Sequence, residues 1–130
     1  MSTTYVDGFG EIDSTGYDAG VKILAATPCP TWCIKPAGHT DPLDVAGVPG
    51  ASECASRLHT AYRWKADEEF GADEVAVEAL EYAYLDGTVM LDAAEMYAHI
   101  KDVPDAHEAE GFAAHLIAAA AALRSTRNDG

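Results

Sequence analysis

Two cysteines and two histidines of the first half of the chain are residue types that bind metal ions. Cys29 and Cys33 lie four positions apart, and His39 and His59 follow them. Two thiolates and two neutral imidazoles suit the tetrahedral coordination of Zn²⁺ and balance its charge. We therefore predict a structural zinc site with Cys29, Cys33, His39 and His59 as ligands, in which Cys54 is the substitute for one histidine.

Two other interpretations of these residues stay open. The cysteines are either small buried apolar residues beside polar surface histidines, or a transient disulfide or redox pair. A single cysteine pair with three intervening residues is less specific than the paired C-x2-C spacing of zinc proteins. The odd number of cysteines, without a secretory context, argues against a disulfide framework.

The segments around these ligands predict a turn followed by a loop. Pro28 and Pro30 exclude a helix at the first cysteine, which follows an apolar run of strand length at Val21–Ala26. Residues 36–50 are rich in Pro, Gly and Asp and predict a loop. Zinc would compensate for the few apolar residues of this loop. We expect regular structure to resume at Cys54–Trp64.

The second half predicts a hairpin, a further strand and a helix. Val75–Tyr84 and Thr88–Leu91 flank the turn dipeptide Asp86-Gly87. Residues 92–101 alternate as a strand does, although their composition also suits a helix. Asp105 is the expected N-cap of the last helix. Its expected apolar face consists of Phe112, Ala113, Leu116, Ile117, Ala120 and Leu123.

Together these elements predict an α+β fold. A zinc-stabilised N-terminal loop region precedes a short antiparallel β-sheet, which is formed by the hairpin around Asp86-Gly87. A C-terminal α-helix packs on that sheet. The length of 130 residues corresponds to about one domain. We expect an irregular segment at residues 1–20, a single zinc-stabilised α+β domain at 21–124 and a flexible tail at 125–130.

Charge limits the classes of partner. The net charge is −14, and residues 66–130 carry fifteen acids against three bases. Such a surface repels phosphate backbones, so nucleic acid is disfavoured and a protein partner with a basic surface is expected. No apolar run is long enough for a membrane, and no signal peptide precedes the domain, which predicts a cytoplasmic protein. The oligomeric state cannot be predicted.

The catalytic motifs that we compared with the chain do not fit. A nucleobase deaminase needs H-x-E and P-C-x-x-C, and the second thiol comes one residue late. A zincin needs a second histidine where Gly111 stands. Hydrolase-elbow, P-loop and dinucleotide motifs are missing from the sequence. We therefore assign no catalytic or cofactor-binding residue, and we interpret His99, His107, His115 and the acids from Asp67 to Glu81 as solvated.

The order C-P-x-W-C, a nearby histidine, the segment Arg57-Leu58-His59-Thr60, a strand pair and an alanine-rich terminal helix resemble a family of uncharacterised domains from actinobacteria and their phages. The resemblance covers about residues 27–124. It implies that the family's cysteine and histidine positions fall on the four predicted ligands, which leaves Cys54 outside the pattern. Because that family has no assigned activity, the resemblance implies a source and a metal site but no reaction.

These observations predict a non-enzymatic, acidic protein-interaction module with a structural zinc site. One alternative is a nucleic-acid mimic that occupies a basic groove of a host protein. A second is a small zinc-dependent enzyme, in which water takes the fourth position on the metal. A third is a nucleic-acid-binding zinc module acting through Arg57, Arg63 and Lys65, which interleave with aromatic residues.

Overall fold

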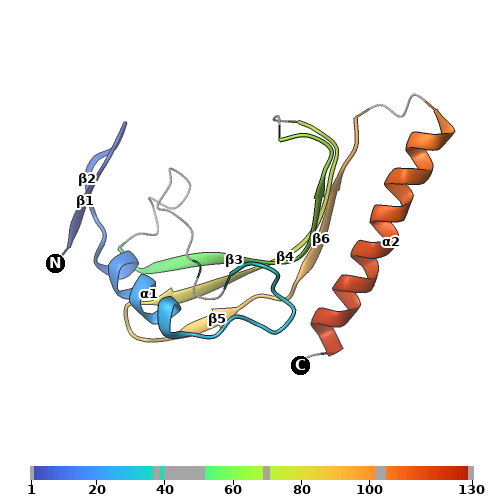
Figure 1. Cartoon of the computed structure of the whole chain (residues 1–130). Helices are drawn as coiled ribbons and strands as arrows, with labels where there is room; N and C mark the ends of the chain where they lie inside the picture. The colour runs from blue at the N-terminus through green and yellow to red at the C-terminus, as the bar shows by residue number, and fades with distance from the viewer. Residues whose placement is uncertain (1, 37–38, 40–51, 69–70, 102–104, 129–130) are drawn as a thin grey trace. The chain divides into compact units, whose positions relative to one another are not determined.

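The computed structural model of the chain describes residues 2–36, 39, 52–68, 71–101 and 105–128, so most of the expected loop at 36–50 lies outside the described residues. The expected α+β fold is confirmed (Figure 1). Two helices, α1 (Thr15–Ala26) and α2 (Ala106–Asn128), accompany six strands in the described residues. The strands are β1 (Thr3–Val6), β2 (Gly10–Asp13), β3 (Cys54–Lys65), β4 (Glu74–Tyr84), β5 (Val89–Leu91) and β6 (Glu95–His99).

The strands form two sheets. β1 and β2 pair antiparallel with Tyr5 opposite Glu11. In the second sheet β4 pairs with β3, β5 and β6. β5 and β6 are both antiparallel to β4, with Leu91 opposite Glu81 and Met96 opposite Val77, so they pair with different parts of the same strand.

The chain divides into two compact units, and the boundary between them falls within β3 and β4. The first unit comprises Met1–Cys29, Lys35–Leu58 and Leu80–Asp92, and the second comprises Pro30–Ile34, His59–Ala79 and Ala93–Gly130. Each unit has its own apolar core. That of the first is built on Leu24, Ala55 and Ala83, and that of the second on Val75, Val77, Ala79, Ala94 and Ala119.

Two local predictions of strands are confirmed. The backbone N–H of Tyr84 donates to Thr88 O at 2.9 Å across the Asp86-Gly87 turn. Gly87 adopts a φ of 92°, a conformation that favours glycine. Residues 92–101 contain β6, so the strand interpretation of this stretch is correct.

The C-terminal helix begins as predicted but packs through a narrower face. Asp105 Oδ1 accepts a hydrogen bond from the Glu108 backbone N–H at 2.8 Å. Ala119 is fully buried, whereas Ile117 is 71% exposed, because only a stripe at helical spacing contacts the core. Phe112, Leu116, Ala119, Ala122 and Leu123 form that stripe. α2 continues to Asn128, so the expectation of a flexible tail from Ser125 is wrong up to that residue.

The interpretation of Val21–Ala26 as a run of strand length is wrong, because these residues form the second half of α1. Gly16, Gly20 and Leu24 recur at a spacing of four residues and are the buried positions of this helix. A Cβ on Gly16 would collide with the backbone of Glu53. The glycines therefore let α1 approach the sheet closely, as Figure 1 shows.

The expectation of an irregular segment at residues 1–20 is wrong for residues 3–20, which include β1, β2 and the first half of α1. β1 and β2 form a hairpin in which Phe9 N–H donates to Val6 O at 2.9 Å, and Gly8 adopts a φ of 86°. The hairpin leads into α1, where Asp13 Oδ1 accepts hydrogen bonds from the backbone N–H and the hydroxyl of Thr15. An Asp-Gly pair at Asp7-Gly8 was the sequence signal for this turn.

We expect Gly20→Ala to lower the free energy of unfolding by about 1–3 kcal/mol. Its Cβ would lie 2.5 Å from Ala83 O and 2.7 Å from Ala55 N, so α1 would have to move away from the sheet. Gly111→Ala is the matched control, because its Cβ would meet open space on α2. It should raise stability by about 0.5–1 kcal/mol. Urea unfolding of both variants measures the two changes in the free energy of unfolding. If both variants changed stability in the same direction, the packing explanation would be contradicted.

Candidate metal centre

The two cysteines of the predicted site lie on a tight turn that follows α1. The helix ends at Ala26, and the C-cap residue Thr27 is extended. Proline on both sides of Cys29 prevents the helix from continuing. The backbone N–H of Cys33 donates to Pro30 O at 3.0 Å, which closes the turn. Both thiols are partly buried.

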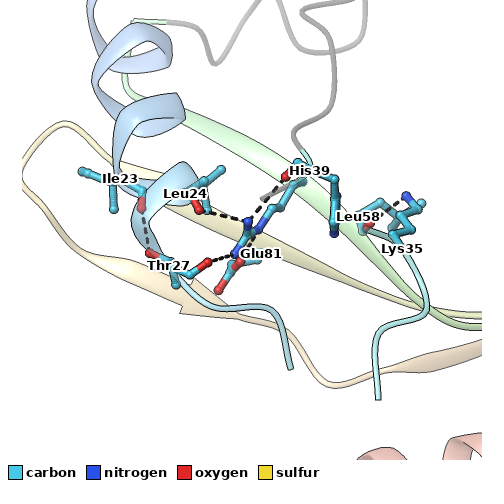
Figure 2. A network of polar contacts seen from close by, with 8 residues as sticks. Ile23, Leu24, Thr27, Lys35, His39, Leu58 and Glu81 are labelled. Carbon is cyan, nitrogen blue, oxygen red and sulfur yellow. Dashed lines mark hydrogen bonds and ion pairs between the residues drawn. The ribbon is translucent and has the colours of Figure 1, made fainter. Parts of the chain in front are cut away.

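The chain after this turn is hydrogen-bonded to β3 near His59. Ile34 N–H donates to Thr60 O at 2.8 Å. Lys35 Nζ donates to Leu58 O at 2.7 Å, as Figure 2 shows. These contacts fix the stretch that follows Cys33 beside the strand that carries His59.

His59 is a fully buried histidine on β3. The strand has alternating faces, and Ala55, Arg57 and His59 are buried on one of them. The Trp32 ring contacts the His59 ring edge to face, with the ring centroids 6.0 Å apart. This packing holds the imidazole in place and shields it from water.

The four predicted ligands come together in the structure. One ligand atom from each of Cys29, Cys33, His39 and His59 lies within 4.8 Å of all the others. Bond lengths of zinc to sulfur and nitrogen place tetrahedral ligand atoms about 3.3–3.8 Å apart. The ligand atoms therefore need to approach one another by at most about 1–1.5 Å to surround an ion, so the four residues lie close enough to hold a metal.

Cys54 lies outside this cluster among the described residues. Burial, and to a smaller extent the carboxylate of Glu53, raises the pKa of the Cys54 thiol above its usual value. A metal ligand must be a thiolate, and a raised pKa disfavours that form. The substitute role predicted for Cys54 has no support from its position.

We predict that Cys54 is alkylated by iodoacetamide several-fold more slowly at pH 8 than glutathione, because only its thiolate reacts and the raised pKa lowers the thiolate fraction. The alkylation rate of Cys54 should continue to rise with pH above the pH at which the alkylation rate of glutathione reaches its plateau. Mass spectrometry of timed samples measures both rates. Glu53→Gln should shift the Cys54 profile to lower pH, and a native Cys54 that reacts as fast as glutathione would contradict the prediction.

The proposed basic and aromatic patch is not confirmed as a set of free surface cations, because Arg57 is buried and Arg63 is exposed but paired. Arg57 is fully buried and pairs with Glu81, with Nε and Oε1 2.7 Å apart. Arg63 Nη2 lies 3.3 Å from Glu68 Oε2, and Arg63 Nε lies 3.7 Å from Glu74 Oε2. Two of the three cations of the nucleic-acid hypothesis thus have carboxylate partners. The expectation that all acids up to Glu81 are solvated is wrong for Glu81 itself.

His115 is also not solvated. Its ring stacks on Trp64 with centroids 4.1 Å apart, and its Nδ1 lies 2.6 Å from the Tyr62 hydroxyl. His115 stands between Phe112 and Ala119 on the packed stripe of α2, which explains its burial. His99 and His107 are exposed, as expected.

Sequence reasoning missed the role of Arg57 and Glu81. The available signal was the alternation on β3, which places Arg57 on the same face as Ala55 and His59. Glu81 is 24 residues away in the sequence, so no local pattern predicts the pair.

No helix in the described part of the chain is both long enough and apolar enough to cross a membrane. No family model matches the sequence, and no significant similarity links the chain to a curated protein or to a solved structure. The function is therefore inferred from the site itself.

Proposed function

We propose that Cys29, Cys33, His39 and His59 bind one Zn²⁺ as a closed structural site. The observation that supports this most strongly is the convergence of the four ligand atoms within 4.8 Å. Two thiolates and two imidazoles form a donor set typical of tetrahedral zinc. Two thiolates also neutralise the ion, so a partly buried site carries no net charge.

A site of this composition favours a structural role over a catalytic one. Four protein ligands fill the coordination sphere of zinc and leave no position for a reactive water. The site lies among the segments that follow α1 and on β3, and the metal would cross-link them. We infer that the protein is a non-enzymatic module and that it works in a reducing compartment such as the cytoplasm, where thiolates persist.

The experiment compares zinc content and folding in four proteins. The wild type and Cys54→Ser should each contain one zinc per chain by elemental analysis. Cys29→Ser and His59→Ala should lose the metal and unfold at lower temperature. Cys54→Ser is the matched control because it removes a cysteine outside the cluster. A folded, metal-free wild type would overturn the proposal, and zinc loss in Cys54→Ser would overturn the ligand set.

We further propose that this module meets a protein partner with a basic surface. The support is the net charge of −14, to which exposed acids such as Glu68, Glu95 and Glu110 contribute. The resemblance to actinobacterial and phage domains stays a prediction about the source.

An arginine-rich peptide is a suitable probe for the proposed partner surface. Its affinity should fall with salt and should weaken in Glu68→Gln/Glu95→Gln/Glu110→Gln, whereas unchanged binding would argue against an electrostatic partner surface.

A further inference from the structure

A buried arginine lies beside the candidate metal centre. Arg57 on β3 is fully buried, and its Nε donates to Glu81 Oε1 on β4 at 2.7 Å. The Glu81 side chain is only 6% exposed. This ion pair uses one edge of the guanidinium and leaves its terminal nitrogens available for other acceptors.

Those nitrogens donate to the backbone carbonyl groups of Leu24, Thr27 and His39, the residues that Figure 2 labels around this network. Nη1 donates to Leu24 O at 2.9 Å, and Nη2 donates to Thr27 O at 2.8 Å. Both carbonyls belong to the end of α1, where the helix dipole favours a cation, and Leu24 O also accepts a hydrogen bond from the Thr27 backbone N–H at 3.0 Å. Nη1 also lies 3.4 Å from His39 O.

These carbonyl groups belong to the segments that carry two of the ligands. Only Pro28 separates Thr27 from Cys29, and the proline ring fixes one of the two backbone torsions of that residue. The Thr27 carbonyl therefore limits where Cys29 can lie. The third carbonyl belongs to His39, which is itself a ligand of the cluster.

We propose that Arg57 is a positioning residue of the metal centre, which holds the Cys29 and His39 segments in place before the ion binds. The inference rests on the proposed metal binding. Glu81 orients the guanidinium, and the guanidinium fixes the two backbone segments. Lysine cannot replace arginine in this role, because a single ammonium group does not present donors in a planar fork.

The test is a Co²⁺ titration of the wild type, Arg57→Lys and three further variants, with a competing chelator. All are kept at a temperature at which circular dichroism shows them to be folded. Arg57→Lys should bind Co²⁺ about 10- to 100-fold more weakly, as loss of a group that orients ligands does elsewhere. Its visible absorption bands should also depart from the tetrahedral pattern, which a loss of stability alone would not cause.

Glu81→Gln and Tyr62→Phe separate stability from positioning. In Glu81→Gln the side-chain amide oxygen would still accept a hydrogen bond from Arg57 Nε, and the carbonyl contacts stay, so affinity should remain within about twofold of the wild type. Tyr62→Phe removes a hydrogen bond to His115 that involves no metal ligand. It should bind Co²⁺ as the wild type does.

Pro28→Gly tests the connection between the Thr27 carbonyl and Cys29 without altering the buried Arg57–Glu81 pair, because Pro28 is exposed. The freer backbone should weaken Co²⁺ binding about two- to fivefold. Wild-type affinity and spectrum in Arg57→Lys would overturn the positioning role. If Arg57→Lys does not fold, wild-type affinity in Pro28→Gly would overturn it. A wild type that takes up neither Co²⁺ nor Zn²⁺ would instead overturn the proposed metal site, together with this inference.

Discussion

Chelation of the metal is expected to lower the free energy of unfolding by about 2–8 kcal/mol relative to protein at about 1 µM free zinc. Structural zinc sites have apparent binding free energies of about 10–16 kcal/mol, and binding to the folded state stabilises it by mass action. The four ligands approach one another only in the folded chain, because His59 is 26 positions beyond Cys33.

Thermal unfolding with and without EDTA measures this effect. The matched control is Cys29→Ser, in which the chelator should leave the unfolding temperature unchanged because the site is already broken. Cys54→Ser should respond to the chelator as the wild type does. An equal unfolding temperature of the wild type with and without EDTA would contradict a structural metal.

Removal of Arg57 is expected to cause the second largest loss. Arg57→Met should cost about 3–5 kcal/mol, because it leaves the buried carboxylate of Glu81 without this ion pair. Glu81→Leu should cost a similar amount for the converse reason. In the double variant no buried charge is stranded, so its cost should fall short of the sum by about 0.5–3 kcal/mol. The cost of the double variant should not fall to zero, because Leu24 O and Thr27 O also lose a hydrogen-bond donor.

Urea unfolding of the two single variants and the double variant gives the coupling energy. The exposed pair Arg63–Glu68 is the matched control, with side chains 44% and 80% exposed and 3.3 Å between Nη2 and Oε2. Its coupling should be about 0–1 kcal/mol. Additive losses at Arg57 and Glu81 would show that the two residues stabilise the fold independently.

The parts of the fold that could be predicted carry local signals. The Asp86-Gly87 turn and the Asp105 cap act within a few residues, so the hairpin and the start of α2 follow from the sequence. α1 could not be predicted in the same way. Gly16 and Gly20 disfavour a helix in isolation, and only their close contact with the segments of β3 and β4 shows why glycine stands there.

In the candidate site, too, the features with a local sequence signal could be predicted and those that depend on distant contacts could not. The types and spacing of cysteine and histidine predict a set of residues that the structure brings together. The surroundings of that set depend on contacts between distant segments. Arg57 suggested a surface cation by its type alone, whereas the structure places it beside Glu81 and the end of α1.

β5 has a consequence for the behaviour of the protein in solution. It pairs with β4 and with no other strand of the described chain, and Val89, Met90 and Leu91 are 39%, 52% and 47% exposed. An open edge with apolar side chains is a template for pairing with further copies. The net charge of −14 opposes that approach through mutual repulsion. The acidic composition therefore also gives the protein colloidal stability, which high salt would weaken by screening.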